Sequence, residues 1–264
     1  MRIQSKTWHQ LSNSNYLTAL LVLNFSLFVL TNLSLHLLHL DIVPYLAMPT
    51  NEWELLYKPW TLLTYMFLHT DFFHILFNVL LLYFTGNLFQ SLLGEKRLLY
   101  VYIMSGLAGA LLLLILQILW PSISGTYLLG ASASVMGIIA GQAIYTPDFS
   151  VHLFFIIQIP FKYFALITFI ISTLLDFSFN TGGKITHIGG AAFGLIYAYL
   201  LKRGTDIQSL SIFQKKASEY LPPKKRFKDE DEYLDYLLDK ISTKGYHSLT
   251  KQEKEDLFKI SQKK

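Results

Sequence analysis

The sequence has no cysteine and little charge. Without cysteine, a disulfide framework, a zinc site with thiolate ligands and a cysteine nucleophile are excluded. Charged residues make up 15% of the 264 positions and hydrophobic residues 52%, whereas a typical soluble domain carries about 25% charge. No basic stripe with interleaved aromatic residues occurs, so we expect no binding to nucleic acid. Residues 1–204 contain the long apolar runs, and residues 205–264 hold most of the charge.

Six apolar segments approach the roughly 20 residues that a helix needs to cross a bilayer. They are 16–40, 72–90, 98–120, 127–146, 163–179 and 185–201. Asp176 is their only Asp, Glu, Lys or Arg, and none of the eight prolines lies inside them. The sequence therefore predicts an all-α, polytopic membrane protein with six transmembrane helices. The first segment is too long for a cleaved signal peptide, so we expect a retained anchor.

Lysines and arginines near the ends of these segments predict the orientation, because they favour the cytoplasmic side. Seven lie on the side of the N-terminus: Arg2, Lys6, Lys96, Arg97, Lys162, Lys202 and Arg203. Only Lys58 and Lys184 lie on the other side. We expect a multi-pass protein with both termini in the cytoplasm, in a bacterial inner membrane.

Two connections and the tail have distinct compositions. Residues 41–71 contain Trp53 and Trp60 and are expected to lie in the outer membrane interface, with a solvated loop as the alternative. Residues 147–162 are partly apolar, which fits an interfacial stretch or an extension of the fifth helix. We expect a membrane domain over 1–204, a linker over 205–228 and a cytoplasmic helical hairpin over 229–264.

The predicted hairpin has recognisable helix signals. Gly245 is a plausible helix stop, and Thr250 with Glu253 has the spacing of a capping box that starts a second helix. Nothing in this tail resembles a catalytic site. It fits a solubilising segment or the binding site of an unknown partner.

Polar side chains inside a membrane are costly and mark functional sites. The candidates are His74, Asn78, Ser132, Asp176 and His187. At about 1.5 Å per residue, His74, Asn78, Ser132 and His187 all lie within about 9 Å of the outer ends of the second, fourth and sixth helices. Four polar residues from three helices therefore share the outer third of the predicted bilayer.

Small residues accompany these positions. Gly190 and Gly194 follow His187 with the small-xxx-small spacing that allows two helices to approach closely, and Gly130 precedes Ser132. A serine near a helix N-terminus and a histidine on a neighbouring helix can act as nucleophile and general base. His74, the Asn78 amide and the backbone N–H of Ser132 are candidate donors to an oxyanion.

At these residues the sequence resembles the rhomboid family of intramembrane serine proteases, over roughly residues 55–202. The resemblance is carried by HTDFFHILFN at 69–78, by Gly130-Ala131-Ser132, and by the HxxGxxxG pattern of His187, Gly190 and Gly194. It implies a six-transmembrane-helix rhomboid-like bundle in which Ser132 and His187 cut single-span membrane proteins near the outer face of the lipid bilayer. His74 and Asn78 would stabilise the oxyanion. No cofactor or metal is implied.

Four positions depart from the family pattern: Thr61, Gln90, Ala133 and Met136 stand where arginine, glutamate, glycine and an aromatic residue are common. They affect the expected rate and substrate preference more than the reaction type. His69 is expected to be structural.

The alternatives are a weak or inactive relative that binds membrane clients, a transporter or channel, and a metalloprotease. A transporter or channel would show charged residues near the midplane or discontinuous helices, and Asp176, the only charged residue within the segments, lies near the outer end of its segment. A metalloprotease would need an HExxH pair, which the sequence lacks. Asp176 is a further candidate, as a third residue that orients His187.

Overall fold

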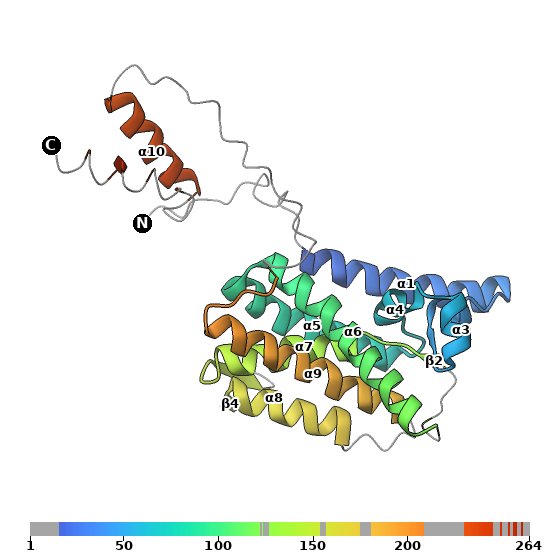
Figure 1. Cartoon of the computed structure of the whole chain (residues 1–264). Helices are drawn as coiled ribbons and strands as arrows, with labels where there is room; N and C mark the ends of the chain where they lie inside the picture. Colours follow the sequence, from blue (N-terminus) through green and yellow to red (C-terminus); the bar gives the residue numbers. More distant parts are fainter. Residues whose placement is uncertain are drawn as a thin grey trace. The chain divides into compact units, whose positions relative to one another are not determined.

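The structure is a computed structural model that describes residues 16–121, 123, 127–153, 157–174, 181–208, 230–244, 249, 253, 256, 257 and 260. The chain divides into two compact units, Met1–Ser211 and Ile212–Lys264. Figure 1 follows the order of the helices and strands along the chain.

The first unit is a bundle of helices, as the sequence predicts. Its main helices are α1 (Tyr16–Leu38), α5 (Phe72–Leu93), α6 (Glu95–Leu119), α7 (Ser132–Tyr145), α8 (Phe161–Phe169) and α9 (Thr181–Lys202). Among the described helices, α1, α5 and α6 are long and apolar enough to span a bilayer. Their bounds lie close to the first three predicted segments. Helix α7 has 14 residues, and α8 continues into a π-helical segment, η3 (Ile170–Leu174).

The start of the fourth predicted helix was wrong by five residues. Residues 127–131 are not part of the helix: Tyr127 and Leu128 form β2, which pairs antiparallel with β1 (Met48–Pro49), and residues 129–131 form a loop. Helix α7 therefore begins at Ser132. Helix α9 begins four residues earlier than predicted, which places His187 well inside the helix rather than near its end. The depths inferred for Ser132 and His187 along their helices change accordingly.

The segment before α5 is folded into short elements. These are α2 (Val43–Leu46), β1, α3 (Glu52–Tyr57), α4 (Thr61–Thr64) and the 3-10 turn η2 (Tyr65–Phe67). Trp53 and Trp60 are exposed, and the Trp60 indole N–H donates to the backbone oxygen of Tyr45 over 2.8 Å. Exposed tryptophans at the rim of an apolar bundle are typical of a segment in the membrane interface.

Residues 147–162 contain a feature that the sequence analysis missed. Strands β3 (Ser150–Leu153) and β4 (Ile157–Pro160) pair antiparallel as a hairpin. The alternative in which these residues extend the fifth helix is therefore wrong. Pro160 precedes the first residue of α8, where proline is well tolerated because its missing N–H has no helical partner.

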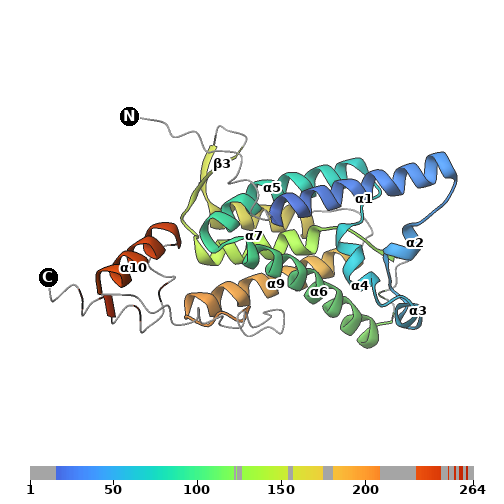
Figure 2. The same cartoon turned by 90° about the horizontal axis from the view of Figure 1, so that it is seen from above.

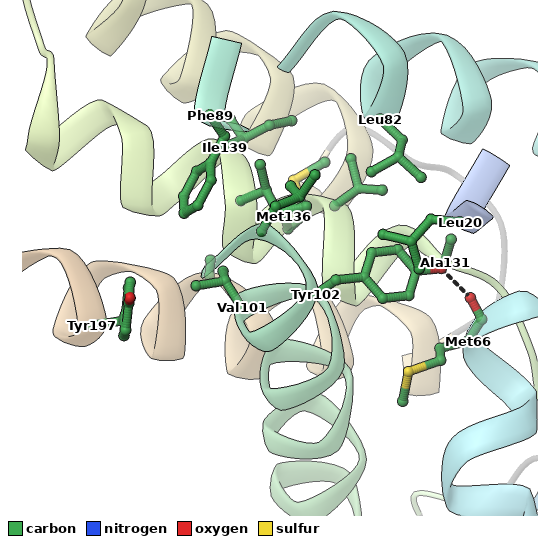
Figure 3. Close-up of a cluster of buried hydrophobic side chains, with 14 of the residues drawn as sticks. Leu20, Met66, Leu82, Phe89, Val101, Tyr102, Ala131, Met136, Ile139 and Tyr197 are labelled. Atoms are coloured by element: carbon green, nitrogen blue, oxygen red, sulfur yellow. Dashed lines mark hydrogen bonds between the residues drawn. The ribbon is translucent and has the colours of Figure 1, made fainter. Parts of the chain in front are cut away.

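Helix α7 is the central helix of the first unit. It contacts α5, α6, α8 and α9 (Figure 2). Nine of its residues are buried, from Ala133 to Gln142. Around it lies an apolar cluster that includes Met66, Tyr102, Met136 and Tyr197 (Figure 3). Within this cluster the Tyr102 hydroxyl donates a hydrogen bond to the backbone oxygen of Met66 over 2.7 Å, so it is not left unpaired.

The second unit contains α10 (Glu230–Lys244), which begins one residue after the start expected from the sequence. Lys240 pairs with Glu253 over 2.6 Å, and Leu237 is fully buried. The predicted stop at Gly245 and the predicted cap at Thr250 lie outside the described residues. The four described residues beyond Leu249 are helical: Glu253, Asp256, Leu257 and Ile260.

Candidate active site

Ser132 is the first residue of α7 and follows a loop that is held from two sides. Strand β2, just before the loop, pairs Leu128 with Met48. Within the loop, the N–H of Gly130 donates to the backbone oxygen of Tyr65 over 2.9 Å. Tyr65 belongs to η2, which is far from this loop in the sequence. The two contacts therefore fix the backbone that leads into α7, and with it the position of Ser132, which is partly exposed.

His69 provides a third anchor for this loop. Its Nε2 accepts a hydrogen bond from the N–H of Ala131 over 3.3 Å, and its side chain is fully buried. Burial, followed by the neighbouring His74, lowers the pKa of His69 to about 3. His69 is therefore neutral at physiological pH, as an accepting Nε2 requires. His69 thus has a structural role, as expected: it holds Ala131, the residue before Ser132.

Gly130 allows the loop to pass directly over His74. Its φ of +122° is a conformation that residues with a Cβ rarely adopt. A Cβ at this position would lie 2.8 Å from Nε2 of His74 and 3.8 Å from Oγ of Ser132. The His74 imidazole and the Ser132 hydroxyl therefore border the same small space. Gly130 acts here through a loop and a side chain, rather than through the helix packing expected from the sequence.

Helix α5 carries His74 and Asn78 one turn apart. The Asp71 carboxylate caps this helix by accepting from the N–H of His74 over 2.8 Å. The Asn78 side chain is buried and donates one N–H to the backbone oxygen of His74 over 2.9 Å. An amide group has two N–H donors, and this bond uses one of them. The Asn78 side chain is thus held by its own helix, whereas the His74 ring lies edge-on to the His69 ring, with 4.9 Å between the ring centroids.

His187 lies on α9, which packs against α7 through glycine. A Cβ on Gly190 would overlap the backbone of Ala133, and one on Gly194 would overlap the backbone of Gly137. The two helices therefore touch backbone to backbone and run in the same direction. Ala133 follows Ser132 and Gly190 is one turn after His187, so both residues lie near the first of these contacts. His187 is mostly buried, with 9% of its surface exposed.

A threonine that the sequence analysis did not single out contacts this histidine. The Oγ1 atom of Thr173, in η3, lies 3.3 Å from Nδ1 of His187. Thr173 is in the fifth predicted segment, where a lone hydroxyl gives no signal until its neighbours are known. Asp176, the residue considered for this role, lies outside the described residues.

Three of the four positions that depart from the family pattern make local contacts, and the fourth, Ala133, meets Gly190 as described above. The Thr61 hydroxyl donates to the backbone oxygen of Lys58 over 2.6 Å, and the Gln90 amide lies 3.3 Å from Oδ1 of Asn87. Met136 is buried one turn after Ser132, and its sulfur lies 3.8 Å from the Ser172 hydroxyl. No set of three His, Asp or Glu side chains among the described residues is arranged as a metal site.

Together, these observations define a class of protein. It is a helical membrane protein in which α5 carries a histidine and an asparagine, α7 a serine and α9 a second histidine, and the loop before the serine passes over the first histidine at a glycine with positive φ.

Comparison with known proteins identifies the family. Residues 57–204 match the family described as the Rhomboid domain, and the chain therefore belongs to the rhomboid family. Over 153 residues it is 33% identical to the rhomboid protease AarA of Providencia stuartii. The matched region covers 52% of this chain and 54% of that protein. The chain thus matches about half the length of this curated relative. Residues 224–263 match a family of unknown function, DUF6576. The family resemblance noted in the sequence is confirmed.

Proposed function

We propose that this protein is an intramembrane serine endopeptidase in which Ser132 is the nucleophile and His187 the general base. One observation carries the proposal: the glycine contact between α7 and α9 lies beside both residues, at the same end of the helix pair. Membership of the rhomboid family and the similarity to a protein named a rhomboid protease support the same reaction.

The proposed reaction follows from these groups. His187 takes the proton of Ser132 while Oγ attacks the carbonyl carbon of the substrate, and a tetrahedral intermediate forms. Its oxyanion receives hydrogen bonds from the His74 imidazole, the second N–H of Asn78 and the backbone N–H of Ser132. When the C–N bond breaks, His187 gives the proton to the leaving amine. Water then attacks the ester with His187 again as base, which releases Ser132.

The length of α7 supports a site below the membrane surface. Its 14 residues extend about 21 Å at 1.5 Å per residue, less than the roughly 30 Å of a bilayer core. We propose six membrane-crossing segments, built on α1, α5, α6, α7, α8 with η3, and α9, with both termini in the cytoplasm. Ser132 then lies beneath the outer face, in a cavity that water enters from outside.

The proposed substrates are single-span membrane proteins, cut near the outer end of their span. Helix-weakening residues there would let the chain unwind toward Ser132. We also propose the division into a membrane domain over 1–204, a linker over 205–228 and a cytoplasmic hairpin over 229–264, with the hairpin available to an unidentified partner. No cofactor or metal takes part in the proposed reaction.

The proposal is tested with purified full-length protein and a single-span reporter substrate. Wild type is expected to cleave it, and Ser132→Ala and His187→Ala are expected not to. Ser134→Ala is the matched control, because Ser134 is a fully buried serine two residues away whose hydroxyl faces the sulfur of Met66 at 4.0 Å. It should keep wild-type activity. Cleavage by Ser132→Ala would overturn the proposal. A wild type that binds reporters without cutting them would favour the client-binding alternative.

A further inference from the structure

Thr173 in η3 and His187 in α9 join two helical elements through a side-chain contact. The 3.3 Å between Oγ1 and Nδ1 is within hydrogen-bonding range, and the two residues are 14 positions apart. Thr173 has only 2% of its surface exposed. A hydrogen bond between the two groups offsets part of the cost of burying the hydroxyl and the imidazole.

The backbone around Thr173 is unusual as well. It lies in η3, a π-helical turn that continues α8. Such turns are rare and often occur at functional sites, because they change which side chains face a neighbouring helix. The preceding residue, Ser172, lies 3.8 Å from the sulfur of Met136 and 3.5 Å from Oγ1 of Thr173. Adjacent residues of η3 therefore contact both α7 and α9 beside the proposed dyad.

We propose that Thr173 is a positioning residue that holds His187 in the tautomer and orientation of a general base; this inference rests on the proposed function. A base that takes the proton of Ser132 at Nε2 must carry its own proton at Nδ1. In that tautomer, the Nδ1–H donates to Oγ1 of Thr173. If Thr173 instead donated to Nδ1, the proton of His187 would be on Nε2, and the imidazole could not accept from Ser132.

The same contact explains how the site works with Met136 in place of an aromatic residue. Met136 offers no flat ring surface against which an imidazole could stack, and a thioether is flexible. A hydrogen bond at Nδ1 restrains the rotation of the imidazole about its Cβ–Cγ bond without any stacking partner. The threonine hydroxyl supplies this restraint without introducing a negative charge into the membrane, where an ionised carboxylate would be costly.

The first test measures the tautomer of His187 directly and does not depend on catalysis. Nitrogen NMR of protein labelled with ¹⁵N-histidine is recorded at a pH where His187 is neutral, and His187→Gln identifies its signals. Wild type should show Nδ1 protonated. Thr173→Val, which replaces the hydroxyl by a methyl group of similar size, should shift the population toward protonated Nε2. An unchanged tautomer in Thr173→Val would overturn the proposal.

The second test separates positioning from packing by kinetics on the reporter substrate. Thr173→Val should lower kcat about tenfold with KM unchanged, a small part of the roughly 10²–10⁴-fold that general-base catalysis contributes. Thr173→Ser should restore kcat because it keeps the hydroxyl. Thr85→Val is the matched control, since Thr85 is equally buried but donates to its own helix at Leu81. It should retain wild-type kcat.

The outcomes distinguish this proposal from the proposed function. If Ser132→Ala still cleaves the reporter, the dyad is wrong, whereas the NMR result still decides whether Thr173 sets the tautomer. If Thr173→Val does not fold, Thr173→Ala replaces it in both measurements. Equal kcat in Thr173→Val and wild type, or no recovery in Thr173→Ser, would contradict the positioning role.

Discussion

Gly190 lies so close to Ala133 that a single added carbon on Gly190 would overlap the Ala133 backbone. This contact brings α9 onto α7 next to Ser132 and His187. Small residues are the usual means of close packing in membrane helices, where burial of apolar surface gives little driving force. The spacing of Ser132 and His187 therefore depends on a residue that takes no part in the chemistry.

Gly190→Ala is expected to separate α7 from α9 at this point. Because the added methyl group meets backbone, which cannot rotate away, we expect a loss of about 1–3 kcal/mol in the free energy of unfolding. The rate of reporter cleavage should fall by more than the loss of folded protein alone would explain. Thermal unfolding in detergent and a cleavage assay measure the two effects.

Gly86→Ala is the control for this substitution. Its Cβ would lie 2.7 Å from the end of the Leu17 side chain, which can change rotamer. It should be milder in both assays. Equal effects from Gly86→Ala and Gly190→Ala would contradict the importance of the α7–α9 contact.

Gly130→Ala should impair activity through the loop rather than through the helices. Alanine at φ +122° is strained by about 1–3 kcal/mol, and its methyl group would press on the His74 imidazole beside Ser132. We expect kcat to fall at least as much as in His74→Ala. Gly94→Ala is the comparison, because Gly94 also has positive φ but has open space where a Cβ would be. An active Gly130→Ala variant would show that the loop conformation is not needed.

The buried His69 predicts that acid destabilises the protein. Its folded pKa of about 3 lies below the ordinary value of 6.5, so the unfolded chain binds a proton more readily than the folded protein does. The stability from neutral His69 is fully present above pH 6.5. It should be lost progressively as the pH falls from about 6.5 toward about 3, with the unfolding temperature in detergent as the measure.

His69→Gln should flatten this pH dependence, because the glutamine amide oxygen can accept from Ala131 without titrating. His152→Gln replaces an exposed histidine on β3 and should retain the wild-type dependence. If His69→Gln loses stability with acid as steeply as wild type does, His69 is not the responsible group.

The sequence predicted the long apolar helices well and the entry to the site poorly. The segments 16–40, 72–90 and 98–120 correspond to α1, α5 and α6 because the hydropathy of a long run determines a helix without help from its neighbours. Residues 127–131 are equally apolar, but their pairing with Met48 and the conformation of Gly130 depend on residues far away in the chain. Periodicity alone does not contain that information.

The site residues divide in the same way. Ser132, His187, His74 and Asn78 were recognised because polar groups stand out in apolar runs and match a family pattern. Thr173 was missed because a threonine in a membrane helix usually bonds its own backbone, as Thr85 does. Its contact with His187 depends on the π-helical turn of η3, which no residue spacing in the sequence predicts.

Covalent labelling of Ser132 tests the central claim most directly. A fluorophosphonate probe reacts with a serine that a neighbouring base activates, so it needs no knowledge of the natural substrate. With full-length protein in detergent, peptide mapping by mass spectrometry should find the label on Ser132. Labelling should disappear in His187→Ala and persist in Ser134→Ala. Label on another serine, or undiminished labelling of Ser132 in His187→Ala, would contradict the assignment of Ser132 and His187 as nucleophile and base.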